Sequence, residues 1–314
     1  MSITTGANCD AKLFDMDTWI RLSYMDDEFK RFSYKEGRKL FIDLFTIVKE
    51  NKQEKIWTIF NIIHREEDKP ALIGSDGHQQ WHINGKLHRN SNLPAVIDSN
   101  GDQAWYKSDK LHRENDEPAV ITYNGQQEWY QQGLLHRDND RPARIFSNGT
   151  KAWYQHNKLH RDNDRPARIF CDGTEEWYQN GLIHRDHNKP AIISDRKQVW
   201  YQNGLQHRDN DEPAMIEGNE TYWWYKNGLR HRDNDRAAII YKNGLQYWYQ
   251  NDQLHRDNDK PALILSTGAQ VWYQKGVIHR DNKPAIIFPT GIQEWYENGE
   301  LYRGSGNSKI SDYQ

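Results

Sequence analysis

The sequence repeats itself at a nearly fixed period. The eleven residues HRDNDRPARIF occupy 136–146 and recur unchanged at 160–170, a step of 24 residues. The pair His-Arg returns along the chain at steps of 24 residues, with two steps of 23, and a degenerate Tyr302-Arg303 closes the series. Self-similarity at such a period is typical of repeat architectures, in which each repeat contacts mainly its neighbours. The period therefore predicts one array of small repeats in place of two ordinary domains.

Two residue types hold fixed places in the repeat. A Trp stands seven residues before each His of the His-Arg pairs. The 13 Trp and 17 Tyr of this otherwise polar chain are far more than disordered chains contain, so we expect the array to fold around them. We interpret both residue types as structural parts of the repeat: Trp81, Trp105, Trp129, Trp153, Trp177, Trp200, Trp224, Trp248 and Trp272, with His88, His112, His136, His160, His184, His207, His231, His255 and His279.

Each repeat contains two turn sequences. Asn-Gly or Asp-Gly follows the Pro-Ala-x-Ile segment in many repeats, and Asn-Gly follows Trp-Tyr in many. These dipeptides tolerate the positive φ angles of a type I′ hairpin turn. A repeat is thus predicted to hold two short strands, PAxI and xWYx, with a second turn leading into the His-Arg segment. If Asn180-Gly181 is a two-residue turn, Tyr178 faces Ile183 and Trp177 faces His184.

These features predict a mostly β protein: an elongated, twisted antiparallel β-hairpin ribbon or solenoid of about 10 repeats over residues 56–303, because large open sheets coil. Residues 1–10 are expected to be a flexible N-terminus and residues 304–314 a disordered tail. Residues 11–55 are expected to form a small helical cap, since Leu40, Phe41, Leu44, Phe45 and Val48 have helical spacing.

The stretches EWYQNGLIHR and VWYQNGLQHR resemble MORN-type repeats, which are short β-hairpin repeats, and especially the variant WYxNGxxHRxxDxPA arrays of large DNA viruses of amoebae. The resemblance covers residues 57–303. It implies a viral, intracellular protein that acts in the host cytoplasm or in the virion.

Metal and cofactor sites are not expected. Equivalent His residues of successive repeats would lie about 9.6 Å apart, at about 4.8 Å per strand, whereas each ligand of a zinc ion lies about 2.0–2.1 Å from it. The loop Asp138, Asn139, Asp140 offers oxygen ligands for calcium, but calcium takes about six to eight. We expect these loops to form turns, with Asp paired to Arg, and keep calcium binding as the alternative.

An enzyme is not expected either. Residues copied ten times are poor candidates for a nucleophile or general base, and the sequence holds no G-x-S-x-G, H-E-x-x-H or Walker motif. The interpretation we favour is a non-enzymatic repeat scaffold that mediates protein–protein interaction. The alternative is an F-box-like adaptor of a ubiquitin ligase, in which a segment with Trp19, Ile20 and Leu22 recruits the ligase and the array selects a target.

The partner is expected to be a protein. A net charge of −3 disfavours nucleic acid and a membrane surface. Residues 136–170 hold eight Lys or Arg against four Asp, which makes Arg141, Arg144, Arg165 and Arg168 candidates for contact with an acidic partner. Self-association is a further expectation, because a repeat sheet ends in an exposed edge strand. The two Cys, Cys9 and Cys171, suit an intracellular location.

Overall fold

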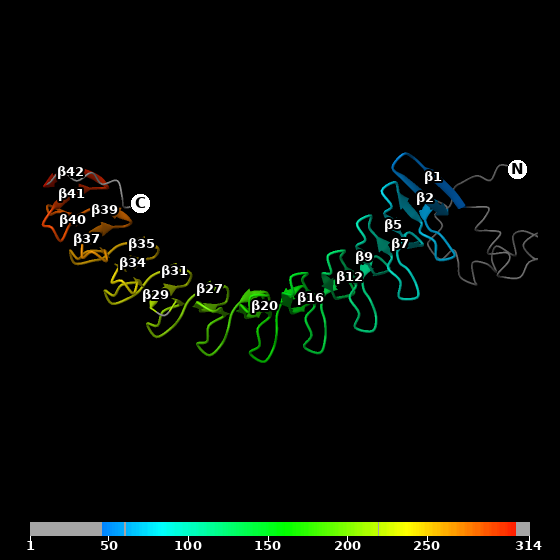
Figure 1. The fold of residues 1–314 in the computed structure, drawn as a ribbon, viewed down its shortest axis with the longest axis horizontal. Helices are drawn as coiled ribbons and strands as arrows, with labels where there is room; N and C mark the ends of the chain where they lie inside the picture. Colours follow the sequence, from blue (N-terminus) through cyan, green and yellow to red (C-terminus); the bar gives the residue numbers. More distant parts are fainter. Residues whose placement is uncertain (1–45, 60, 219, 306–314) are drawn as a thin grey trace, which may run out of the picture. The chain divides into compact units, whose positions relative to one another are not determined.

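The computed structural model describes residues 46–59, 61–218 and 220–305, whose regular structure is all β-strand. The predicted tandem array of antiparallel hairpins is confirmed. The chain divides into two compact units: the first holds the residues up to Arg137 together with Ala143–Ser147, and the second holds Asp138–Pro142 together with the residues from Asn148 onward. Within each unit the strands follow one another in sequence order (Figure 1).

The sheet of the first unit is antiparallel and begins with two long strands, β1 and β2, which pair with each other. Each following repeat adds two short strands. The strands of this sheet are β1 (Thr46–Glu50), β2 (Glu54–Ile59), β3 (Ile62–Ile63), β4 (Leu72–Gly74), β5 (Gln79–Gln80), β8 (Val96–Ile97), β9 (Gln103–Ala104), β12 (Val120–Ile121), β13 (Gln127–Glu128) and β16 (Arg144–Ile145).

The sheet of the second unit continues the same plan, with pairing alternately within a repeat, as β20 with β21, and between repeats, as β21 with β24. Its strands are β17 (Lys151–Ala152), β20 (Arg168–Ile169), β21 (Glu175–Glu176), β24 (Ile192–Ile193), β25 (Lys197–Val199), β28 (Met215–Glu217), β29 (Thr221–Trp223), β32 (Ile239–Ile240), β33 (Gln246–Tyr247), β36 (Leu263–Ile264), β37 (Gln270–Val271), β40 (Ile286–Ile287), β41 (Gln293–Glu297) and β42 (Glu300–Ser305).

Two-stranded hairpins branch from these sheets, one in each complete repeat, and begin with the residue that follows Trp, which is His82 in the first hairpin and Tyr in the others. In the first unit they are β6 (His82–Ile83) with β7 (Lys86–Leu87), β10 (Tyr106–Lys107) with β11 (Lys110–Leu111), and β14 (Tyr130–Gln131) with β15 (Leu134–Leu135). In the second they are β18 (Tyr154–Gln155) with β19 (Lys158–Leu159), β22 (Tyr178–Gln179) with β23 (Leu182–Ile183), β26 (Tyr201–Gln202) with β27 (Leu205–Gln206), β30 (Tyr225–Lys226) with β31 (Leu229–Arg230), β34 (Tyr249–Gln250) with β35 (Gln253–Leu254), and β38 (Tyr273–Gln274) with β39 (Val277–Ile278).

The predicted hairpin register is confirmed, but the strand around Trp is not continuous. Tyr178 lies opposite Ile183, and the backbone N–H of His184 donates to the carbonyl of Trp177 at 3.0 Å. The N–H of Trp177 instead donates to the carbonyl of Ala191, in the next repeat, at 2.9 Å. Because its two backbone groups bond in different directions, Trp ends the sheet strand and begins the separate hairpin.

The core is made by the constant residues of the repeat. The Ala of each Pro-Ala pair, for example Ala167 and Ala191, has no exposed surface. The Trp that lies beside it is buried too, and Trp177 is only 6% exposed. A methyl group is the largest side chain that leaves room for the indole, which explains why Ala recurs at this place.

The predicted helix over residues 11–55 is wrong where the structure describes it. Residues 46–50 form β1 and residues 54–55 begin β2, and Val48, placed on the helix by its spacing, lies opposite Trp57 across these strands. The β-branched run of Thr46, Ile47 and Val48 favours a strand, and β2 provides a partner for all five residues of β1. Leu40, Phe41, Leu44 and Phe45 lie outside the described residues.

The C-terminal boundary also differs from the expectation. β42 extends through Gly304 to Ser305, and so continues two residues into the range assigned to a disordered tail. Residues 306–314 lie outside the described part of the chain. Within that part, no helix has the length and apolar character that crossing a membrane requires.

Candidate functional site

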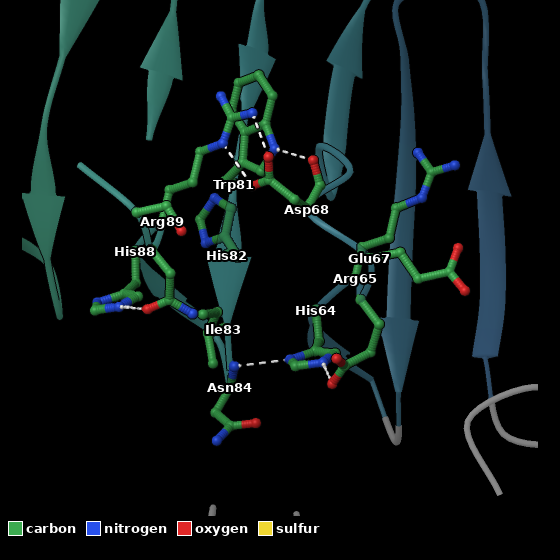
Figure 2. A pocket seen from close by; sticks show the side chains of 13 residues that line it. His64, Arg65, Glu67, Asp68, Trp81, His82, Ile83, Asn84, His88 and Arg89 are labelled. Carbon is green, nitrogen blue, oxygen red and sulfur yellow. Dashed lines mark hydrogen bonds and ion pairs between the residues drawn. The ribbon is translucent and has the colours of Figure 1, made fainter. Parts of the chain in front are cut away.

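A Trp, an Arg and, in most cases, an Asp join successive repeats. Figure 2 shows one such cluster in the first unit, where the Arg89 guanidinium lies 3.8 Å from the centroid of the Trp81 ring. Arg89 Nε and Nη2 donate to the two carboxylate oxygens of Asp68 at 2.7 Å, and Trp81 Nε1 donates to the Asp68 carbonyl at 3.0 Å. A stacked Arg in a bidentate ion pair is among the stronger polar arrangements in proteins. We call this arrangement the Trp–Arg–Asp clamp.

The clamp recurs along the second unit with nearly constant geometry. Arg185 lies 3.7 Å from the Trp177 ring, donates to both carboxylate oxygens of Asp164, and reaches the Pro190 carbonyl at 3.1 Å. The hydrogen bond from Arg185 holds the pKa of Asp164 at about 2, well below its usual range. Three segments of the chain therefore meet at the Trp of this clamp, and the predicted pairing of loop Asp with Arg is confirmed.

Where the clamp Asp is replaced by Asn, a Glu restores the charge. Asn188 stands at the place of Asp164, and there Glu212 accepts from Arg208 at 2.5 Å and from Asn188 Nδ2 at 3.0 Å. In the first unit Asn92 and Glu117 make the same exchange around Arg113. At the place of Glu212, repeats that keep Asp carry a cation in most cases, as Lys189 carries beside Asp164. Charge balance at the clamp is thus maintained.

The repeated His residues also connect repeats. His160 Nδ1 accepts the backbone N–H of Asn180, in the turn of the next repeat, at 3.1 Å. Its Nε2 lies 3.0 Å from Asp162 Oδ1, so this nitrogen carries the proton and donates to the carboxylate. Both ring nitrogens are therefore used in structural bonds, as they are in His184, His207, His231 and His279.

The Asp-Asn-Asp loops form tight turns. Asn139 and Asp140 have φ angles of 57° and 56°, and the N–H of Arg141 donates to the Asp138 carbonyl at 3.3 Å. Two successive positive φ angles define a type I′ turn, which Asn and Asp tolerate better than other non-glycine residues. Among the residues that the structure describes, no group of three or more His, Cys, Asp or Glu is placed to hold a metal ion.

Small pockets lie between successive His-Arg loops. The pocket in Figure 2 has a volume of about 440 Å³ and is lined by the loops at 64–68 and 88–91 and by the Trp81 strand. A similar pocket of about 290 Å³ lies between the loops at 160–164 and 184–187 of the second unit. The clamp residues in both walls bind one another, whereas His82 Nδ1 in the first pocket is buried without a hydrogen-bond partner among the described residues.

The four candidate Arg residues have different surroundings. Arg144 lies beside Glu128, with Nε and Oε1 2.9 Å apart, and Arg168 Nη1 lies 3.3 Å from Glu176 Oε2. Both Glu residues lie outside residues 136–170, so they were not included when the local excess of positive charge was counted from the sequence. Arg165 contacts the clamp residue Asp140, as Lys189 contacts Asp164. Arg141 lies exposed in its loop.

An exposed apolar position, which the sequence analysis did not single out, follows the turn Gly in the small hairpins. Leu182, Leu205 and Leu229 occupy it in three successive repeats and are 52%, 50% and 42% exposed. Other repeats place Lys there, as Lys110 and Lys158 show. The clue in the sequence was the variation at this position, which holds Leu182 in one repeat and Lys158 in another.

The comparisons with known proteins give no name to this arrangement. No protein-family model matches the sequence, and no curated protein matches it. Trp19, Ile20 and Leu22, on which the F-box-like alternative depends, lie outside the described residues.

Proposed function

We propose that this protein is a non-enzymatic repeat scaffold that binds a protein partner through the residues that vary among its repeats. One observation supports this function: the constant Trp, Arg, His and Ala residues are taken up by bonds and packing between repeats, as at Trp177, Arg185 and Ala191. The position after the hairpin turn is exposed, and the repeats differ there, as Leu182 and Lys158 show. Binding residues on a rigid frame are typical of repeat proteins.

The repeats are proposed to be of the MORN type. Their antiparallel hairpins and Asn-Gly turns support the resemblance in the WYxNGxxHR segments. The resemblance also favours an origin in a large DNA virus, and with it a role in the infected cytoplasm or in the particle.

A catalytic role is disfavoured by the bonding of the repeated His residues. A general base needs a nitrogen lone pair directed at a substrate. In His160 the Nδ1 lone pair accepts a backbone N–H and Nε2 donates to Asp162. The same two bonds recur in several repeats, which indicates architecture.

The test is affinity capture with the full chain from cells that express it, followed by titration of the purified chain with the purified captured protein. The proposal expects a saturable complex of defined stoichiometry. Two results would contradict it: no protein enriched above a control bait, or a hydrolytic or transferase activity that one His→Ala change abolishes while the circular dichroism spectrum stays unchanged.

A further inference from the structure

Three successive repeats of the second unit present an apolar and an acidic side chain close together. Leu182, Leu205 and Leu229 are about half exposed. The first Asp of the loop that follows each Leu is exposed by 57%, 63% and 58% of its side chain, at Asp186, Asp209 and Asp233. We call these six residues the Leu–Asp stripe.

Within a repeat the Leu and the Asp are linked by one side chain. Gln179 lies opposite Leu182 across the hairpin, so the two side chains share a face. Gln179 Nε2 donates to Asp186 Oδ2 at 2.7 Å. The next repeat links Leu205 to Asp209 in the same way through Gln202, with a bond of 2.8 Å. In the third, Lys226 takes the place of Gln.

Between repeats the apolar row is continuous. A Cβ atom at Gly204 would lie 3.5 Å from Leu182 Cδ2, and one at Gly228 would lie 3.4 Å from Leu205 Cδ2. Each Leu thus packs on the turn Gly of the following repeat, immediately before the next Leu. The stripe therefore runs on one exposed face without interruption over three repeats.

Two of the three carboxylates of the stripe, Asp186 and Asp209, bond a neutral Gln amide and a His, whereas Asp233 is paired with Lys226 Nζ at 2.9 Å. Asp186 bonds the neutral amide of Gln179 and His184 Nε2, and the hydrogen bond from His184 lowers the pKa of Asp186. The other Asp of each loop differs, because it is bound by the clamp Arg, as Asp211 is by Arg232. An anionic membrane or a nucleic acid would be repelled by the exposed carboxylates. A cationic, partly apolar partner complements them.

The spacing indicates how such a partner would lie. In the sheet from which the hairpins branch, equivalent residues of successive repeats are two strands apart, or about 9.6 Å. An extended polypeptide rises about 3.1–3.3 Å per residue, so three of its residues cover about the same length. A segment with an apolar side chain at every third position, and Lys or Arg beside it, would place one apolar and one basic side chain on each repeat.

We propose that the Leu–Asp stripe binds an extended, basic polypeptide segment with apolar residues at intervals of three. This rests on the proposed scaffold function and names the chemistry of the partner. Lys110 and Lys158, at the place of Leu in other repeats, show which substitution the fold accepts.

The test is a selection of phage-displayed random peptides on the purified full chain, with affinities of the selected peptides then measured by fluorescence anisotropy. The expected peptides carry Lys or Arg and apolar residues three apart. Leu205→Lys weakens their binding at least about tenfold, Asp209→Asn weakens it several-fold and reduces its dependence on salt, and the control Lys110→Ala leaves it unchanged.

Acidic peptides, an empty selection, or equal binding to Leu205→Lys would overturn the proposal. So would a dimer of the wild-type chain in analytical ultracentrifugation that Leu205→Lys converts to a monomer, because a second copy would then occupy the stripe. If a captured partner protein binds Leu205→Lys as well as the wild type, the proposal for the stripe is wrong but the proposed scaffold function stands. If no partner is captured, the proposed scaffold function is wrong.

Discussion

Two stretches of the sheet in the second unit have the same backbone but different cores. At the start of the unit, neighbouring strands place Arg168 opposite Glu176 on the core face. Further along, the same row holds apolar side chains, of which Val199 and Ile239 are 2% exposed. Both stretches have the constant Trp, Ala and clamp residues. The difference teaches that the constant residues determine the fold, while this row tolerates an ion pair or an aliphatic contact.

The polar stretch is held by a small network. Tyr178 Oη donates to Glu176 at 3.1 Å, and burial raises the pKa of Tyr178 to about 12. Arg168 Nε is buried without a hydrogen-bond partner among the described residues. Partly buried ion pairs lose hydration energy that their attraction only partly returns. The apolar stretch holds no ion pair in this row, although Trp223 Nε1 is also buried without a partner among the described residues. Because a neutral indole N–H loses less hydration than two charged groups, we expect the apolar stretch to be the more stable of the two.

The largest effect is expected from removal of a Trp, and it should be equal in the two stretches. Trp177→Ala and Trp248→Ala each remove a ring that is 6% or 7% exposed, and each should lower the free energy of unfolding by about 3–5 kcal/mol. Urea denaturation followed by circular dichroism measures both. If one variant lost less than half as much free energy of unfolding as the other, the variable row, and not the constant residues, would determine local stability.

A smaller effect should distinguish the stretches. Glu176→Ala leaves Arg168 half-buried and unpaired and should cost about 1–3 kcal/mol, whereas the double change Arg168→Ile with Glu176→Val should restore or exceed wild-type stability. The thermodynamic cycle of Arg168→Ile, Glu176→Val and the double variant measures this coupling. A double variant as unstable as Glu176→Ala would show that the ion pair is needed for the fold.

Acid should weaken the clamps. The pKa of Asp164 is lowered to about 2 by the hydrogen bond from Arg185, so the folded state binds this proton less readily than the unfolded chain. Its contribution is present above about pH 4 and is lost as the pH falls toward 2. Because this carboxylate is 36% exposed, we expect at most about 1 kcal/mol. The urea midpoint of Asp164→Asn should depend less on pH in this range than that of the wild type, and an equal dependence would contradict this assignment.

The exchanged clamp offers a compensation test. Glu212→Lys places a second cation beside Arg208 and should cost about 1 kcal/mol, because Asn188 cannot supply the missing charge. Adding Asn188→Asp recreates the usual clamp and should recover most of the loss. Thermal unfolding of the two variants measures it, and no recovery would show that the charges act independently.

The register of the hairpins and the turn chemistry could be predicted from the sequence, because Trp177, His184 and the Asn-Gly turn lie within a few residues of each other. The break at Trp could not, since it depends on a bond to Ala191 in the next repeat. The helix predicted over Val48 is wrong for a similar reason, because pairing with β2 stabilises a strand there more than a short helical periodicity stabilises a helix.

The clamp itself joins Trp177 to a carbonyl 13 residues earlier and Arg185 to a carboxylate 21 residues earlier. Periodicity alone does not reveal such contacts. The sequence did contain one clue: where Asn188 replaces the usual Asp, Glu212 replaces the usual Lys or Arg, and this paired change indicates that the two positions lie close together.

The most direct test of the central claim, that constant residues build the fold and the exposed Leu residues of the Leu–Asp stripe bind the partner, is a paired measurement on Leu205→Lys. Its free energy of unfolding should stay within about 0.5 kcal/mol of the wild type, because an exposed side chain changes, while binding of a captured partner or selected peptide falls at least about tenfold. A clear loss of stability, or binding that does not change, would contradict the claim.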